Sequence, residues 1–291
     1  MTWRTVIVRE RAKLDYSLNF MTVRKEAETR KLSLSEIYMV IVESTAVSLT
    51  AVLLNELVKN KIKVVFCDEK RTPSSELLPY YGSHDTSLKY KYQLDWTEEC
   101  KQRVWTRIVY EKIYNQMLLL KKLNKDEYKL LEQYLNEIEW NDNSNREGHA
   151  AKVYFNALFG LDFSRNKECF VNAALDYGYS IILSAFNREI VSCGYFTQLG
   201  LCHKNPLNKF NLASDFMEPF RILVDEEVYN LEQSEFSKEH KNILINILNK
   251  TVTIDDKQQT VANAIKIYCR SLFTGLKEED LEYIKMYKYE L

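Results

Sequence analysis

The spacing of apolar residues along the chain changes after about the first 75 positions. Before that point, runs of β-branched and aromatic residues, or of apolar residues alternating with polar ones, predict strands at 3–8, 14–20, 37–42 and 62–67. Between the last two runs, Leu53 and Leu57 fall at helical spacing. The pattern therefore predicts a small β-rich domain at 1–75 with one short helix.

Beyond a segment with proline, glycine and several serines, which predicts a linker at 76–90, the period becomes helical. Trp105, Val109, Ile113 and Met117 recur every four residues and predict one face of a long helix. Positive charge lies off that stripe at Lys101, Arg103, Arg107, Lys112 and Lys121. Further helices are predicted at 128–138, 170–185, 238–249 and 261–272. The expected fold class is α+β, with the β-rich domain followed by a larger all-α domain at 91–291 that carries the candidate catalytic residues.

Composition and charge narrow the function classes. Hydrophobic residues make up 46% and charged residues 28% of the 291, which is typical of a folded globular chain and not of a disordered one. Lys and Arg number 40 against 41 Asp and Glu, so any DNA contact must come from local basic patches. No apolar run approaches the roughly 20 residues that cross a bilayer. Without a CxxC pair or a secretory leader, we expect a reduced, cytoplasmic protein that does not span a membrane.

Acidic side chains and one histidine, in two separate stretches, are the clearest candidates for catalysis. His203 lies in a segment whose proline and asparagine predict a loop, and Asp215 and Glu218 are three residues apart, which places both on one face of a helix. Upstream, Glu147 begins a predicted helix that Asn145 could cap, although a glutamate there is also explained by the helix dipole. Carboxylates with one imidazole favour Mg²⁺ or Mn²⁺ over zinc.

Pro219 leaves two geometries open for the acidic pair. It is harmless if a helix begins at about Ser214, and otherwise it implies a kink beside the two carboxylates. His149 points roughly 200° away from Glu147 around the helix, so a structural or DNA-contacting role suits it better than ligation. Other residues could meet flanking phosphates or be solvated surface charges: Lys204, Lys209, Arg165 and Arg221. These residues alone indicate a metal-dependent enzyme acting on a phosphate ester.

Two stretches resemble motifs of a known family. REGHAAKVYF, at 146–155, followed by GLCHKNPLNKFNLASDFMEPFRILVD, at 200–225, closely resembles the CRISPR-associated integrases, the metal-dependent nucleases that insert new spacers during adaptation. The residues of these two motifs are similar to those found in type II systems, and subtype II-A is expected. Members of this family begin with a small β-rich domain and continue into a helical catalytic domain, so the resemblance covers the whole chain.

The resemblance implies a set of metal ligands and catalytic residues. Matched position by position, the family's metal-binding glutamate falls on Glu147, its histidine on His203 and its last acidic ligand on Glu218. Many relatives carry aspartate at that last position, so the longer side chain here should shift the backbone slightly without abolishing ligation. Asp215 matches a neighbouring acidic position and is expected either to ligate the metal or to hold a ligand or a water molecule.

The reaction implied by the resemblance is strand transfer, in which the 3′-hydroxyl of a captured DNA fragment attacks a phosphodiester at the border of a CRISPR repeat. Mg²⁺ or Mn²⁺ is the implied cofactor, and double-stranded DNA is the implied substrate. The implied assembly is a homodimer, formed largely through the β-rich domain, which joins a small ferredoxin-like adaptation protein in a heterohexamer. Two alternatives remain open: a structure-selective nuclease that processes branched DNA without integration, and a non-catalytic DNA-binding or assembly subunit.

Overall fold

The computed structural model describes residues 4–80, 82–232 and 235–290. The chain divides into two compact units, Met1–His84 and Asp85–Leu291. This division falls inside the segment 76–90 that the sequence predicts as a linker. The last strand of the first unit, however, ends at Leu77 and the first helix of the second begins at Thr86, so a strand and a helix take up the two ends of that segment.

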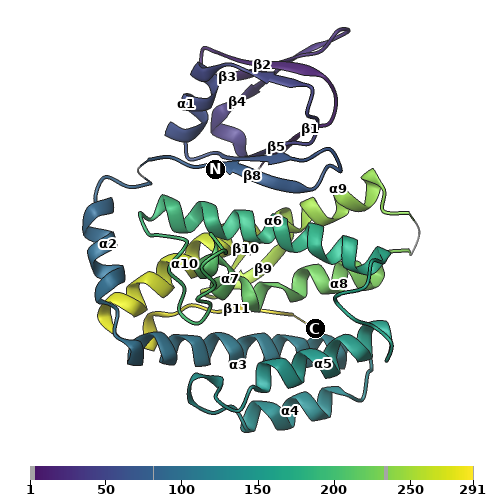
Figure 1. Ribbon diagram of the computed structural model, residues 1–291, viewed down its shortest axis with the longest axis vertical. Coiled ribbons are helices and arrows are strands. Elements are labelled where there is room, and N and C mark those ends of the chain that lie inside the picture. The colour runs from purple at the N-terminus through teal and green to yellow at the C-terminus, as the bar shows by residue number, and fades with distance from the viewer. Residues whose placement is uncertain (1–3, 81, 233–234, 291) are drawn as a thin grey trace. The chain divides into compact units, whose positions relative to one another are not determined.

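The first unit contains two four-stranded sheets in its described residues (Figure 1). One sheet consists, in spatial order, of β1 (Arg4–Val8), β5 (Ile37–Val42), β7 (Lys63–Cys67) and β8 (Pro73–Leu77). The other consists of β4 (Thr29–Ser33), β3 (Phe20–Arg24), β2 (Ala12–Ser17) and β6 (Val47–Leu49). In the first sheet only β8 runs antiparallel to its neighbour, whereas in the second only the β2–β6 pairing is parallel.

The core of this unit is formed by apolar positions of the strands and of helix α1 (Ala51–Lys59). Leu14 and Val40 from the strands and Leu53 and Leu57 from α1 are fully buried in one cluster. The helix spacing of the two α1 leucines thus places both on the face that packs against the sheets. The strands that the sequence predicts at 3–8, 37–42 and 62–67 are confirmed, within the described residues, as β1, β5 and β7.

The single strand predicted over 14–20 is wrong, because this segment folds as a hairpin. β2 ends at Ser17 and pairs with β3, which begins at Phe20. Leu18 and Asn19 form the connecting turn, with φ angles of 50° and 67°. Asparagine tolerates these left-handed angles, but leucine rarely adopts them, so the pair does not look like a turn in the sequence.

The second unit is mainly helical. Its α-helices in the described residues are α2 (Thr86–Asp95), α3 (Glu98–Lys122), α4 (Tyr128–Asn136), α5 (Arg146–Phe159), α6 (Phe170–Ser192), α7 (Asn211–Met217), α8 (Ile222–Asn230), α9 (Lys238–Asn246) and α10 (Val261–Glu278). Short 3₁₀ turns lie in both units at Leu34–Glu36, Trp140–Asp142, Glu218–Phe220, Ile247–Asn249 and Leu281–Tyr283. None of the described helices combines the length and the apolar character that crossing a bilayer requires.

A three-stranded antiparallel sheet also belongs to the second unit, in the spatial order β10 (Lys257–Thr260), β9 (Thr251–Ile254) and β11 (Tyr287–Lys288). Asp255 and Asp256, with φ of 54° and 55°, turn the chain between β9 and β10. The α+β class and the order of a β-rich part followed by a helical part are confirmed, but the helical part is not all-α.

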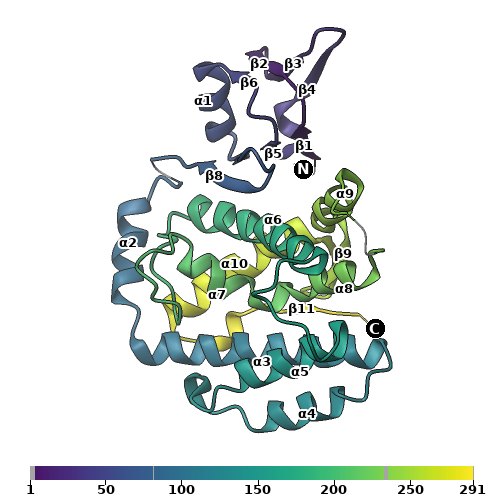
Figure 2. The same ribbon diagram turned by 45° about the vertical axis from the view of Figure 1, so that its right-hand side comes forward.

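Helix α3 is the long element around which the second unit packs, and α4 and α5 lie alongside it in both views (Figures 1 and 2). Its predicted stripe is confirmed, because Trp105, Val109, Ile113 and Met117 are all buried. Thr97 caps the helix by accepting a hydrogen bond from the Cys100 backbone N–H. Two glutamates in the first turn and two lysines in the last complement the helix dipole, so the sequence defines both ends.

Close packing of α6 on α8 requires a glycine at position 178. A Cβ at Gly178 would lie 2.4 Å from Cγ1 of Val224. We expect Gly178→Ala to lower the free energy of unfolding by about 1–3 kcal/mol, because the added methyl overpacks this contact. Chemical denaturation measures the change, and the double variant Gly178→Ala, Val224→Ala should recover part of it. Equal loss in the single and double variants would show that Val224 is not the obstacle.

Candidate active site

Glu147 stands in the first turn of α5, which begins directly after Asn145, as the sequence predicts, but without the expected Asn145 side-chain cap. Asn145 occupies the cap position with φ of 51°, and its side chain makes no capping hydrogen bond. The Asp142 carboxylate instead accepts hydrogen bonds from the backbone N–H groups of Arg146 (2.8 Å) and Glu147 (3.1 Å). Asn145 thus takes the predicted cap position, but the expected capping by its side chain is wrong. Asp142 instead anchors the backbone from which the Glu147 side chain projects.

Glu218 stands at a break between two helices. Pro219 lies in the 3₁₀ turn Glu218–Phe220, between α7 and α8, so the kink beside the acidic pair is confirmed and a helix start at Ser214 is not. The Pro219 carbonyl accepts hydrogen bonds from Nδ2 of Asn115 (3.1 Å) and from the hydroxyl of Tyr287 (2.8 Å). Helix α3 and strand β11 thus hold the turn that carries Glu218.

Asp215, fully buried in α7, closes the loop that precedes this helix. Its Oδ2 accepts hydrogen bonds from the backbone N–H groups of Leu201 (2.5 Å) and Cys202 (3.2 Å), and its Oδ1 from that of His203 (3.2 Å). Oδ1 also lies 2.5 Å from Nδ1 of the His203 ring. A Cβ at Gly200 would lie 2.7 Å from Asp215 Oδ2 and 2.4 Å from the His203 carbonyl oxygen, so this approach needs glycine. With Nδ1 engaged, Nε2 is the ring nitrogen left for another partner.

Lys112 from α3 joins the two glutamates, which come from distant parts of the chain. Its Nζ lies 2.6 Å from Glu147 Oε1 and 2.5 Å from Glu218 Oε2. Nε of Arg221 lies 2.9 Å from the other carboxylate oxygen of Glu218. The side chains of Lys112 and Glu218 are only 12% and 4% exposed. Burial alone would raise the pKa of Glu218, but the positive charges of Arg221 and Lys112 outweigh it and lower this pKa to about 2.

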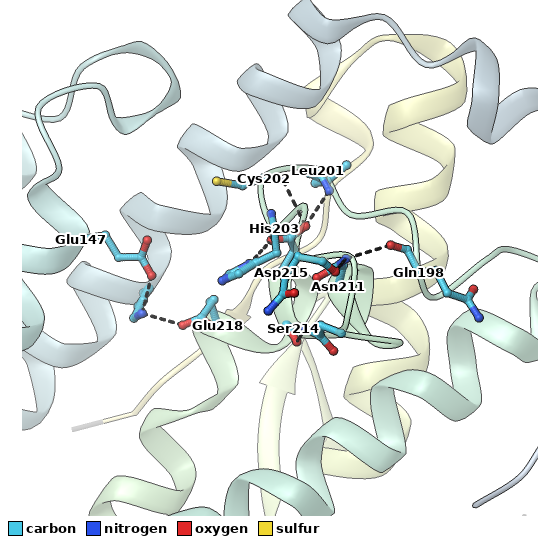
Figure 3. A network of polar contacts seen from close by, with 12 residues as sticks. Glu147, Gln198, Leu201, Cys202, His203, Asn211, Ser214, Asp215 and Glu218 are labelled. Carbon is cyan, nitrogen blue, oxygen red and sulfur yellow. Dashed lines mark hydrogen bonds and ion pairs between the residues drawn. The ribbon is translucent and has the colours of Figure 1, made fainter. Parts of the chain in front are cut away.

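The His203 imidazole lies near the same carboxylates. In Figure 3 its ring extends from Asp215 toward the side on which Glu147 and Glu218 lie. The hydrogen bond with Asp215 is the main cause that raises the pKa of His203, burial opposes it, and the negative charges of Glu218 and Glu147 add to the rise. Trp105 from α3 meets the ring edge to face, with centroids 5.9 Å apart. The imidazole is therefore oriented on two sides but still 43% exposed.

The predicted metal residues form two connected pairs and not one closed ligand set. Across residues 4–80, 82–232 and 235–290, no three His, Cys, Asp or Glu side chains are grouped so that they could hold a metal ion as they stand. Glu147 and Glu218 share Lys112, and His203 is held by Asp215. The donor chemistry nevertheless fits Mg²⁺ or Mn²⁺, because two carboxylates within 2.6 Å of one cationic nitrogen are close enough to reach one metal ion.

Two of the residues predicted to contact DNA form ion pairs within the protein. Arg221 pairs with Glu218, and its guanidinium lies 4.6 Å from the centre of the Tyr179 ring. Arg165 forms an ion pair with Asp176. Arg221 thus belongs to the internal charge balance of the site, which is a different role from the predicted phosphate contact.

The other three predicted DNA contacts are exposed. Lys204 and Lys209, together with Lys101, line an open pocket of about 500 Å³ that His203 also lines. His149 is exposed on α5 and does not line this pocket. Lys101 and Lys204 both pair with Glu98, so part of the positive charge beside the histidine is balanced within the protein.

Lys112 is the functional residue that sequence reasoning missed. The sequence prediction that Lys112 lies off the apolar stripe is wrong. Lys112 follows Trp105 by seven residues and so lies on nearly the same face of the helix, with its side chain only 12% exposed. Its neighbours Glu111, Asn115 and Gln116 are also buried. A cluster of polar residues on the buried side of a long helix was the available signal.

Comparison with known proteins decides the family. The family model described as CRISPR associated protein Cas1 matches residues 5–247. The chain belongs to the Cas1 family. It is 32% identical, over 292 residues, to the CRISPR-associated endonuclease Cas1 of Neisseria meningitidis serogroup C (strain 8013), an alignment that covers 98% of this chain and 96% of the relative. The family resemblance of the two sequence motifs is thereby confirmed.

Solved structures show the same fold as this Cas1-family chain. A Cas1 protein from Thermotoga maritima superposes with a TM-score of 0.78 at 19% identity, covering 99% of this chain and 100% of the other. A casposase bound to its integration product superposes with a TM-score of 0.77 at 20% identity, covering 97% of this chain and 92% of the other. A Cas6-RT-Cas1–Cas2 complex contains a chain with a TM-score of 0.75 at 18% identity, which covers 97% of this chain and 36% of the larger one.

Replacing Asp215 by asparagine is expected to lower the pKa of His203, because the Asp215 hydrogen bond is the main cause of its rise. Titration of the ring by NMR in chelator-treated protein measures this pKa. Asp176→Asn, which changes a carboxylate paired with Arg165 instead, is the matched control and should leave it unchanged. An unchanged value in the Asp215 variant would contradict the assigned pairing.

The same pair gives a pH dependence of stability. A raised pKa in the folded state means that the pair stabilises the fold fully below the unfolded-state histidine pKa of about 6.5. This stabilisation is lost as the pH rises through the higher folded-state pKa. In chelator-treated protein, the difference in unfolding free energy between wild type and Asp215→Asn should therefore shrink as the pH rises from about 6.5 through the folded-state pKa of His203. A difference that grows with pH would refute the assigned stabilisation.

Proposed function

We propose that this Cas1-family chain is a DNA endonuclease and integrase of CRISPR adaptation that depends on Mg²⁺ or Mn²⁺. The observation that carries the proposal is the meeting of Glu147 and Glu218 on one cationic nitrogen, beside a histidine that Asp215 orients. Membership of the Cas1 family supports the activity, since relatives of this length and similarity are named CRISPR-associated endonucleases.

The residues present fit one divalent ion. Glu147 and Glu218 would supply carboxylate oxygens and His203 would supply Nε2, while Asp215 keeps Nδ1 engaged, an arrangement that commonly fixes metal-binding imidazoles. Asp215 itself already receives three backbone N–H groups and the ring, so we assign it to positioning and not to ligation. When bound, such an ion would act as a Lewis acid on the scissile phosphodiester and on the attacking oxygen.

In the proposed reaction, the 3′-hydroxyl oxygen of a captured fragment attacks a phosphorus atom at the border of a CRISPR repeat. A new P–O bond forms to the fragment's 3′-oxygen, which gives up its proton, the old P–O bond breaks, and the departing 3′-oxygen of the repeat strand takes up a proton, so that no proton is gained or lost overall. Lys204 and Lys209 are placed to attract the flanking phosphates, because both line the pocket that contains His203. Water in place of the fragment's hydroxyl would give hydrolysis at the same site.

The fold shared with a casposase that was solved on its integration product supports strand transfer over hydrolysis alone. The fold shared with a chain of a Cas6-RT-Cas1–Cas2 complex supports a Cas2 partner. From the family resemblance we further propose that the protein acts as a homodimer with a small ferredoxin-like partner in a heterohexamer on double-stranded DNA. We further propose a cytoplasmic location. Assignment to type II, subtype II-A, stays a prediction from the residues of the motifs. The genes that neighbour this one on the chromosome would decide the subtype.

Glu147→Gln, His203→Ala and Glu218→Gln are each expected to reduce divalent-dependent strand transfer by about 100-fold or more, because each removes a proposed metal ligand. The measurement is joining of a 3′-hydroxyl fragment to repeat DNA in the presence of the small partner. Glu132→Ala, an exposed acidic residue of α4, is the control and should retain wild-type joining.

The products of this assay separate the proposed function from its alternatives. Cleaved but never joined repeat DNA would indicate a structure-selective nuclease. Wild-type joining by all three variants would refute the site, and stoichiometric Mn²⁺ binding that none of them weakens would refute the ligand assignment.

A further inference from the structure

The candidate site is balanced in charge by groups of the protein itself. The carboxylates of Glu147 and Glu218 face the cations Lys112 and Arg221, with all three ion-pair distances between 2.5 and 2.9 Å. Arg221 contacts only Oε1 of Glu218 in these pairs, which leaves Oε2 and the Glu147 carboxylate to Lys112. Lys112 is thus the group that holds the two proposed metal ligands together.

The lysine nitrogen lies where the carboxylates of the two proposed metal ligands, Glu147 and Glu218, come together. Carboxylate oxygens bind divalent ions at about 2.0–2.6 Å, and Lys112 Nζ lies at similar distances, 2.6 and 2.5 Å, from Glu147 Oε1 and Glu218 Oε2. An ion between these oxygens would therefore overlap the ammonium group. An ion bound to both of these oxygens would then compete with the lysine for the same place.

The Lys112 contact differs from an ordinary surface ion pair. Lys112 is 12% exposed, and Glu218 Oε2 is buried and accepts no well-formed hydrogen bond from any residue that the structure describes. Its contact with Lys112 is thus one of charge at short distance, which a divalent ion could replace. A lysine side chain has four flexible methylene groups, so its ammonium can leave this position without movement of helix α3.

We infer that Lys112 is a tethered counterion that occupies the metal position until a divalent ion displaces it. This inference rests on the proposed function, because it takes Glu147 and Glu218 as ligands of the metal. In the metal-free protein the ammonium keeps the two carboxylates together and prevents their mutual repulsion. On metal binding the lysine is released toward solvent or toward an incoming phosphate, so the metal affinity is set partly by the cost of displacing it.

Direct measurement of Mn²⁺ affinity tests this competition without recourse to catalysis. Mn²⁺ binding at pH 7.5, followed by electron paramagnetic resonance of the free ion, is compared among wild type, Lys112→Met, Lys112→Gln and Lys112→Arg. Lys122→Met is the matched control. Lys122 lies in the same helix as Lys112, ten residues or about 15 Å further along its axis, and pairs with Glu226 of α8. Circular dichroism with and without Mn²⁺ reports whether each variant is folded.

We expect Lys112→Met and Lys112→Gln to bind Mn²⁺ about tenfold or more tightly than wild type, because the ion no longer displaces a positive charge. Lys112→Arg keeps the charge and should not gain affinity. The methionine variant should also melt at a lower temperature without metal and gain more from Mn²⁺ than wild type does. If the methionine variant unfolds without metal, the Mn²⁺ affinity is measured on the glutamine variant instead, because its amide can still donate a hydrogen bond to a carboxylate.

Failure of the inference and failure of the proposed function are distinguishable. Equal or weaker Mn²⁺ binding by the folded Lys112→Met and Lys112→Gln proteins, with wild-type binding intact, would overturn the competition and leave the metal site standing. Absence of Mn²⁺ binding in wild type and in every variant would overturn both. Binding that appears only when Lys112 loses its charge would support the inference in its strongest form.

Discussion

Charge balance inside the helical unit is the constraint on which the site depends. Lys112 from α3, Glu147 from α5, Glu218 from the 3₁₀ turn and Arg221 beside α8 neutralise one another, and of these side chains Lys112 and Glu218 are largely buried. Leaving one partner of a buried ion pair alone typically costs about 3–5 kcal/mol. The four elements are therefore held in register by electrostatics as well as by apolar packing, and a change in one charge is felt by all of them.

A second polar layer supports the first. The Tyr154 hydroxyl donates a hydrogen bond of 2.9 Å to Asp225 Oδ2, and the Tyr179 hydroxyl donates to Oδ1. Burial raises the pKa of Asp225 to about 6 even though both tyrosines stabilise its charged form. Since the Tyr179 ring also lies against Arg221, the cluster restrains the guanidinium that contacts Glu218. Precise placement of one carboxylate thus draws on residues of α5, α6 and α8.

Local patterns in the sequence predicted most elements but not their long-range pairing. The four-residue spacing of apolar residues from Trp105 to Met117 identified α3, because a helix that is buried on one face carries apolar residues at regular intervals. The Leu18–Asn19 turn and strand β11 left no comparable pattern, since one uses an unusual turn residue and the other exists only through its pairing with β9. Family motifs pointed to the acidic and imidazole groups. They could not reveal Lys112, because its place in the site depends on contacts with residues 35 or more positions away in the sequence.

The hydrogen bond from Tyr287 to the Pro219 carbonyl has a consequence for how the protein is made. The turn that carries Glu218 is fixed from one side by α3, which is synthesised early, and from the other by β11, which is synthesised among the last residues of this sequence. While residue 287 is still within the ribosome, the turn lacks one of its two supports. Both hydrogen bonds to this turn can therefore form only after residue 287 has left the ribosome, and until then Glu218 is held less firmly.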